Sequence, residues 1–184
     1  MEKDYIIKSL ETQRLQLDTF EKIIYFKVPF LCLFASLMSI TNGFQQLSTI
    51  SFEETLPKYS LVFLIIGLVS FKLKFNRLKM TILENPVLDF RNRILNLAEK
   101  RKWKIEKDDK LAMVFKTIPI RGYDEYLSYS KHSGERIYIF INQNRIYLKS
   151  IHNLDDWTFK FDFGENLSNE KALVQAINAA HHEI

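Results

Sequence analysis

One segment of the chain gathers side chains that are suited to binding a ligand. Residues 119–135 read PIRGYDEYLSYSKHSGE. Tyrosine rings offer faces on which bases stack, and the cationic side chains among them suit phosphate groups. The combination predicts a site for an anionic, base-containing ligand, made of Arg121, Tyr123, Tyr126, Tyr129, Lys131 and His132. A strand with a tyrosine-rich exposed face explains the same composition without a ligand.

The other reactive residue types form no recognisable catalytic or metal-binding motif. Two adjacent histidines near the C-terminus would point roughly 100° apart on a helix, so they would not chelate as a pair. The carboxylate pairs Asp108-Asp109 and Asp155-Asp156 fall where turns are expected, and Asp favours turns through local hydrogen bonds to the backbone. The sequence holds no Gly-rich phosphate loop and no Ser in a Gly-flanked elbow. We therefore expect a non-enzymatic protein with no catalytic residue, metal or cofactor.

Composition places the chain among folded proteins and leaves its partners open. Of 184 residues, 47% are hydrophobic and 26% charged, with only 5 Gly and 4 Pro, which is too apolar for a disordered chain. A net charge of +4 permits anionic partners without requiring them. The single cysteine, Cys32, excludes an intrachain disulfide and lies in an apolar run, where it is typical of a small buried hydrophobe.

Two apolar runs predict a hairpin of membrane helices. Residues 28–40 read VPFLCLFASLMSI, and with their flanks they reach about 19 residues, close to the ~20 that span a bilayer. The run at 59–71 has only about 13 residues, a length that by itself favours a helix buried in a protein core. Both runs are apolar on every face, which favours lipid over a soluble helical hairpin. We expect membrane helices at about 23–41 and 59–76.

The distribution of Lys and Arg predicts the topology of this hairpin. Residues 1–27 and 72–79 are rich in Lys and Arg, whereas residues 41–58 contain only Lys58. Because cytoplasmic flanks carry an excess of Lys and Arg, the pattern predicts an inner-membrane protein with both termini in the cytosol. Residues 1–22 add an apolar stripe at helical spacing, typical of a helix that lies on a membrane surface or packs against another protomer.

Residues 85–184 read as a cytosolic α+β domain. The second membrane helix is expected to run on to about Leu83, with Asn85 as the N-cap of the next helix. Apolar alternation predicts strands at 111–118, 136–141, 145–151 and 157–163, a fifth strand near 103–107 and a last helix after Ser168. The expected fold class is an α-helical transmembrane hairpin, within residues 1–84, joined to a small α+β domain. This domain is expected to hold an antiparallel sheet of four to five strands flanked by two helices.

The layout of the chain resembles the small two-helix membrane effectors of bacterial anti-phage defence, which carry a cytosolic domain that senses a cyclic oligonucleotide. The resemblance implies an antiviral effector whose helices act on the membrane, a homo-oligomer, and a cyclic oligonucleotide or other anionic ligand. No DNA duplex is expected as a partner. The alternative is a membrane-anchored scaffold or adaptor whose cytosolic domain binds a protein or an anionic lipid, with the basic stretches 72–79 and 100–107 facing lipid.

Overall fold

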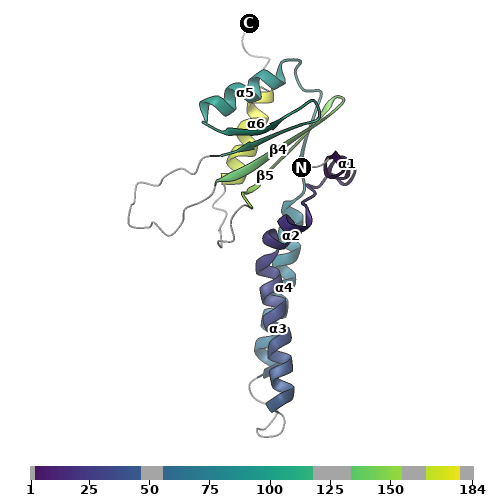
Figure 1. Cartoon of the computed structure of the whole chain (residues 1–184), viewed down its shortest axis with the longest axis vertical. Coiled ribbons are helices and arrows are strands. Elements are labelled where there is room, and N and C mark those ends of the chain that lie inside the picture. Colours follow the sequence, from purple (N-terminus) through teal and green to yellow (C-terminus); the bar gives the residue numbers. More distant parts are fainter. Residues whose placement is uncertain (1–2, 47–55, 118–133, 155–164, 179–184) are drawn as a thin grey trace, which may run out of the picture. The chain divides into compact units, whose positions relative to one another are not determined.

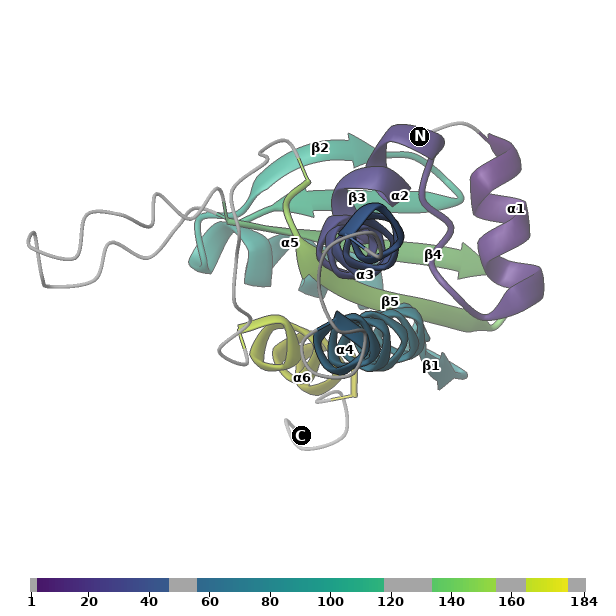
Figure 2. The ribbon, with the colours of Figure 1, turned by 90° about the horizontal axis from the view of Figure 1, so that it is seen from below.

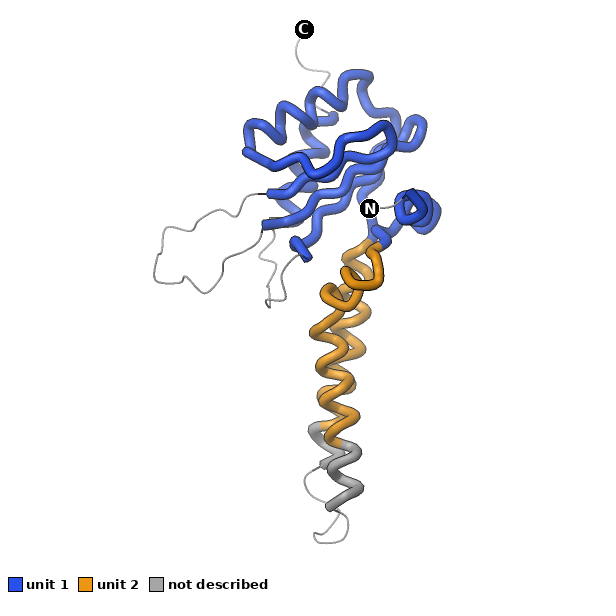
Figure 3. The backbone as a smooth tube through the Cα atoms, in the orientation of Figure 1, with its two compact units in different colours: residues 1–16, 79–184 blue, residues 17–78 orange. Residues whose placement is uncertain are grey.

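The computed structural model describes residues 3–46, 56–117, 134–154 and 165–178, with side chains at 3–39, 60–117, 134–154 and 166–178 (Figure 1). The chain forms two compact units, coloured separately in Figure 3. The first unit combines residues 1–16 with 79–184, and the second contains residues 17–78. The first and last parts of the sequence therefore belong to one unit, and the apolar runs belong to the other.

The first unit is built on a five-stranded antiparallel sheet with the strand order β1-β5-β4-β3-β2. Helices α5 and α6 pack on one face of this sheet, and α1 lies beside β4 (Figure 2). Its elements are α1 (Lys3–Thr12), β1 (Thr81–Glu84), α5 (Phe90–Lys100), β2 (Lys104–Asp108), β3 (Ala112–Lys116), β4 (Glu135–Asn142), β5 (Arg145–His152) and α6 (Glu165–Asn178).

The core of this unit lies between the sheet and helices α5 and α6. Alternate residues of β3, β4 and β5 face the helices, as expected from the period-two pattern of strands. The largest fully buried side chains of this cluster include Phe115, Ile139 and Leu148 from the sheet and Ile94 and Leu173 from the helices. The residues between them in sequence, such as Tyr138 and Phe140, are also buried, so β4 is apolar on both faces.

The strands predicted at 136–141 and 145–151 are present as β4 and β5, and they form a hairpin. The two strands pair from Glu135↔His152 to Asn142↔Arg145, and two residues form the turn. The backbone of Gln143 takes the positive φ, at 50°.

The elements around residue 85 differ from the prediction. No helix runs on to Leu83, because residues 81–84 form β1 and pair with β5, with Ile82 opposite Tyr147. Asn85 is not a helix N-cap: its φ is 50°, and its N–H donates to the carbonyl oxygen of Asn144 at 2.8 Å. The residues after it reach α5 only at Phe90. Pairing with a strand distant in sequence thus overrides the local helix signal.

The second unit is a pair of antiparallel helices preceded by a short one. Helix α2 (Thr19–Tyr25) begins at a capping box formed by Asp18 and Glu21. Helices α3 (Lys27–Gln46) and α4 (Leu56–Arg77) pack along their lengths. Close approach is allowed by Gly67, where an added Cβ would lie 3.0 Å from the side chain of Leu33.

The fold class expected from the sequence, with its transmembrane hairpin, is wrong. In the described part of the chain the fold is a small α+β protein with a five-stranded antiparallel sheet and six helices. No single helix there is long and apolar enough to cross a membrane. The first run is divided between two helices. Helix α2 and residues 27–39 of α3 reach the length and apolar composition of a membrane span only when they are taken together, and their axes are bent by 69°. Helix α4, which contains the second run, carries Lys72, Lys74 and Arg77 in its last two turns.

The ends of β3 and β4 are tied together at Gly134, and this contact yields a stability prediction. Gly134 has a φ of 74°, and an added Cβ would lie 2.1 Å from the carbonyl oxygen of Thr117. We expect Gly134→Ala to lower the free energy of unfolding by at least about 1 kcal/mol, because both the backbone strain and the clash oppose it. Urea denaturation of the full chain measures this. As a control, truncating the fully exposed Leu88 to Ala should cost under about 0.5 kcal/mol, and equal losses would contradict the prediction.

Candidate functional site

The ligand site predicted from the sequence lies outside the described residues. This holds for all six of its members: Arg121, Tyr123, Tyr126, Tyr129, Lys131 and His132. The strand expected at 157–163 lies outside them as well. The structure describes the two points on either side of this segment, the end of β3 and the start of β4. There the N–H of Glu135 donates to the Thr117 hydroxyl and the N–H of Thr117 to the Glu135 carbonyl oxygen, each at 2.8 Å.

Of the Asp108-Asp109 pair, Asp109 serves the β2–β3 turn as the sequence suggests, whereas Asp108 ends β2 and forms an ion pair with Arg91 at 2.5 Å. Asp109 Oδ1 accepts from the N–H groups of Leu111 and Ala112 at 2.9 and 2.8 Å. Lys107, whose ammonium lies 2.8 Å from the other carboxylate oxygen, lowers the pKa of Asp109, and the two N–H bonds lower it further. Among the described residues, no group of three or more His, Cys, Asp or Glu side chains is arranged to hold a metal ion.

A buried polar network between α6 and the sheet is the most distinctive polar feature of the first unit. Its buried members are Glu135 of β4, Ser150 of β5, and Asn169 and Glu170 of α6. Isolated buried polar groups are costly, so their contacts with one another decide whether the network stabilises the fold.

Glu170 closes the edge of β5 where β1 ends. The β1–β5 pairing reaches Thr81↔Leu148 and goes no further. Beyond it, Glu170 Oε1 accepts from the N–H of Ser150 at 3.0 Å and lies 2.9 Å from the ammonium of Lys149. Glu170 Oε2 accepts from the Thr81 hydroxyl at 3.2 Å. The Glu170 carboxylate therefore binds the backbone of β5 just beyond its pairing with β1 and fixes α6 on the sheet.

A second set of contacts leads from Glu135 to the protein surface. The amide of Asn169 donates to the buried carboxylate of Glu135, and the Ser150 hydroxyl lies 3.2 Å from the same oxygen. The other end of the Asn169 amide accepts from Arg101 Nη1 at 3.2 Å. The guanidinium of Arg101 also lies 5.8 Å from the centre of the Trp103 ring. The buried carboxylate of Glu135 thus positions the exposed guanidinium of Arg101 through the side-chain amide of Asn169.

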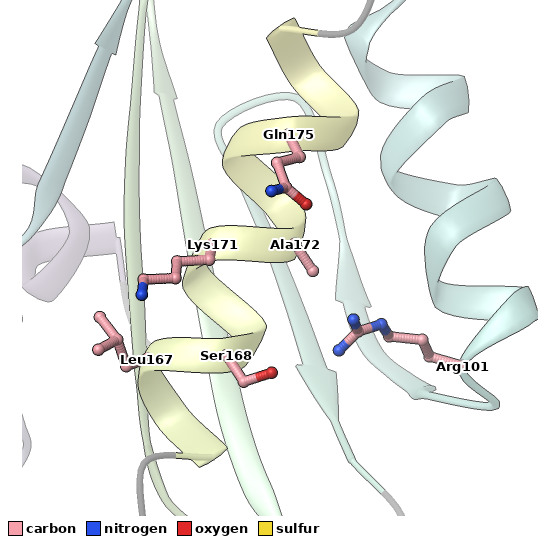
Figure 4. Close-up of a pocket in the computed structure, with 6 residues that line it drawn as sticks. All are labelled: Arg101, Leu167, Ser168, Lys171, Ala172 and Gln175. Atoms are coloured by element: carbon pink, nitrogen blue, oxygen red, sulfur yellow. The ribbon is translucent and has the colours of Figure 1, made fainter.

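Arg101 borders an open pocket of about 320 Å³ on α6 (Figure 4). The other lining residues are Leu167, Ser168, Lys171, Ala172 and Gln175. In Figure 4, Arg101 and Ser168 point toward one another, whereas Lys171 extends along the opposite side of the helix. No carboxylate lines the pocket, and its polar groups include a guanidinium, an ammonium, a hydroxyl and an amide. This set suits a phosphate or carboxylate group.

Sequence reasoning missed this pocket. From the sequence alone, Arg101 is only a member of the basic stretch 100–107, which would face lipid in the scaffold alternative. Arg101 became a candidate only through Asn169, which is distant in sequence and has no distinguishing local motif.

The helix pair of the second unit presents an extensive apolar surface. Ser36 and Ser60 are buried, and the Ser36 hydroxyl donates to the carbonyl oxygen of Ser60 at 2.9 Å. The large apolar side chains are exposed instead: on α3 Phe30, Leu31, Phe34, Leu37 and Met38, and on α4 Leu61, Val62, Phe63, Leu64, Ile65, Ile66, Leu68, Val69, Phe71, Leu73 and Phe75. Contiguous exposed apolar surface of this kind marks contact with a membrane or another protein.

Comparison with known proteins leaves the function to be argued from geometry. No protein-family model, curated protein or solved structure matches this chain. Among the described residues, the surfaces best suited to bind a partner are the cationic pocket of the first unit and the apolar surface of the helix pair in the second.

The contacts of Glu170 predict that removing its carboxylate destabilises the fold. We expect Glu170→Ala to lower the free energy of unfolding by roughly 3–5 kcal/mol, because Lys149 and the N–H of Ser150 would lose their acceptor in a buried setting. Urea denaturation checks this, with Glu99→Ala on the exposed side of α5 as the matched control. If both variants unfold at the same urea concentration, Glu170 does not close the sheet edge.

Proposed function

We propose that the protein is a non-enzymatic, membrane-associated effector whose α+β unit senses an anionic ligand. The observation that carries this proposal is the apolar exposure of α3 and α4. A helix in a water-soluble fold normally buries its apolar stripe and exposes polar residues. Here the hydroxyls of Ser36 and Ser60 are inside the pair and Leu, Ile, Val and Phe side chains are outside. Lipid is the solvent that accommodates this arrangement.

Lipid contact does not require one helix to cross the bilayer. Apolar helices also insert partway into the boundary between headgroups and acyl chains, with a strength that scales with the apolar area buried. The proposal is therefore association of the helix pair with the bacterial inner membrane, through the exposed side chains of α3 and α4.

The sensing part of the proposal concerns the α+β unit. The Arg101 pocket offers positioned donors for an anionic group, and the tyrosine-rich residues 121–132 offer bases a stacking surface. A cyclic oligonucleotide, as in the anti-phage effectors that the chain resembles, carries both phosphates and bases. A symmetric homo-oligomer would place several sensing units around such a ligand.

The second candidate is a membrane-associated scaffold or adaptor whose α+β unit binds a protein or an anionic lipid. The open shape of the α6 pocket favours it (Figure 4), because sites for small molecules usually enclose most of the ligand. The two candidates share the membrane contact and differ in what the α+β unit binds.

Membrane association is tested by making the full chain in a cell-free system with phospholipid vesicles and floating the vesicles. We expect the protein in the vesicle fraction. Replacing Leu61 and Leu68 by Asp, each 56% exposed on α4, should reduce flotation about tenfold or more, because charges are costly in lipid. The matched control places Asp at Leu88 and Leu111, which are exposed in the α+β unit, and should float normally. Full-length protein that remains in the aqueous fraction would contradict the proposal.

Ligand sensing is tested by calorimetry of the detergent-purified full chain with linear and cyclic oligonucleotides. Binding should weaken with added salt, and removing one stacking tyrosine should cost about 1–3 kcal/mol. Arg121→Ala and Arg101→Ala distinguish the tyrosine-rich segment from the α6 pocket as the phosphate site, with the exposed Lys110→Ala as a control. If no oligonucleotide binds, the effector loses its support and the scaffold is the better description.

A further inference from the structure

Four of the five positive charges of the helix pair are gathered at one of its ends, whereas Lys58 lies near the other end. Because α3 and α4 are antiparallel, the first residue of α3 lies beside the last turns of α4, as the stacking of Phe26 on Phe71 at 4.8 Å confirms. This end carries Lys27, Lys72, Lys74 and Arg77, which we call the basic collar. Neither α3 nor α4 contains an Asp or Glu anywhere along its length.

Contacts within the second unit hold Lys74 at the centre of the collar. Its ammonium donates to the carbonyl oxygen of Tyr25 and lies 4.9 Å from the centre of the Tyr25 ring. In return the Tyr25 hydroxyl donates to the carbonyl oxygen of Lys74 at 3.2 Å. The side chain is therefore fixed in place before any partner arrives.

The cations of the collar repel one another. Burial, and after it the charges of Lys27 and Arg77, together lower the pKa of Lys74 to about 8. An anion placed at the collar would relieve this repulsion.

The collar borders directly on the apolar surface. Leu73 and Phe75 alternate in sequence with the cations of α4 and are 58% and 45% exposed. Phe30, one turn into α3, is 47% exposed. A molecule that fits both regions has an anionic group joined to a long apolar part, which is the chemistry of an anionic phospholipid.

We propose that Lys74 and Arg77, supported by the buried charge of Lys27 behind them, bind the headgroup phosphate of an anionic phospholipid while its acyl chains lie against α3 and α4. The phosphate supplies several acceptor oxygens for the ammonium group and the guanidinium. The proposal rests on the membrane association proposed above and adds a preference among lipids. It assigns the apolar surface next to the collar to lipid and not to a second copy of the chain.

The test compares binding of the full chain to phosphatidylcholine vesicles with binding to vesicles that also contain phosphatidylglycerol. We expect tighter binding to the second, with a preference that shrinks as salt is added. Replacing Lys27 and Arg77 together by Gln should reduce the preference roughly twenty-fivefold, at about fivefold for each charge. The matched control replaces Lys104 and Lys110, two exposed lysines of the α+β unit, and should keep the preference.

The outcomes separate this inference from the proposed function. If the chain binds neither kind of vesicle, membrane association itself is wrong, and the lipid site is wrong with it. Equal binding to both kinds keeps membrane association and overturns the headgroup site. A Lys27 and Arg77 variant that retains the full preference also overturns it. Undiminished binding of this variant to phosphatidylcholine vesicles shows that it is folded, so that a lost preference reports on the collar.

Discussion

The exposed apolar surface of α3 and α4 must be removed from water, and this constraint governs the second unit. Polar groups are placed where the two helices meet, with Ser36 bonded to the backbone of Ser60 and Gly67 allowing close packing. Acidic residues are absent from both helices, and the basic collar stands at one end. These features are together expected for a helix pair whose surroundings are apolar and whose end meets anionic headgroups.

The first unit follows the opposite rule, with an apolar interior and charged residues outside, except at the network under α6. Buried polar groups contribute to specificity only when their hydrogen bonds are made. Glu170 meets this condition by closing the edge of β5, and Oε2 of Glu135 meets it by accepting from Asn169. The position of α6 on the sheet, and hence the place of Arg101 at the surface pocket, depends on these contacts.

Local patterns in the sequence were sufficient for some elements and insufficient for others. The β4–β5 hairpin was predictable because alternating apolar residues flank an Asn-Gln-Asn turn. Strand β1 was not, because Thr81–Glu84 is a strand only by pairing with β5. Counting apolar residues from 23 to 41 as one helix missed the bend between α2 and α3. The Arg101 pocket depends on Asn169 and Glu135, contacts between distant residues that no local pattern encodes. The six predicted ligand residues lie outside the described part.

The single cysteine of the chain allows the contact between α3 and lipid to be measured directly. Cys32 lies on α3 between the exposed Leu31 and Phe34 and is itself partly exposed. A polarity-sensitive fluorophore attached to Cys32 should shift its emission to the blue when the full chain meets vesicles. Lipids with a quencher on their acyl chains should then quench it, because the probe would lie among those chains. Emission that remains water-like and unquenched on vesicle-bound or free protein would contradict a lipid-facing helix pair.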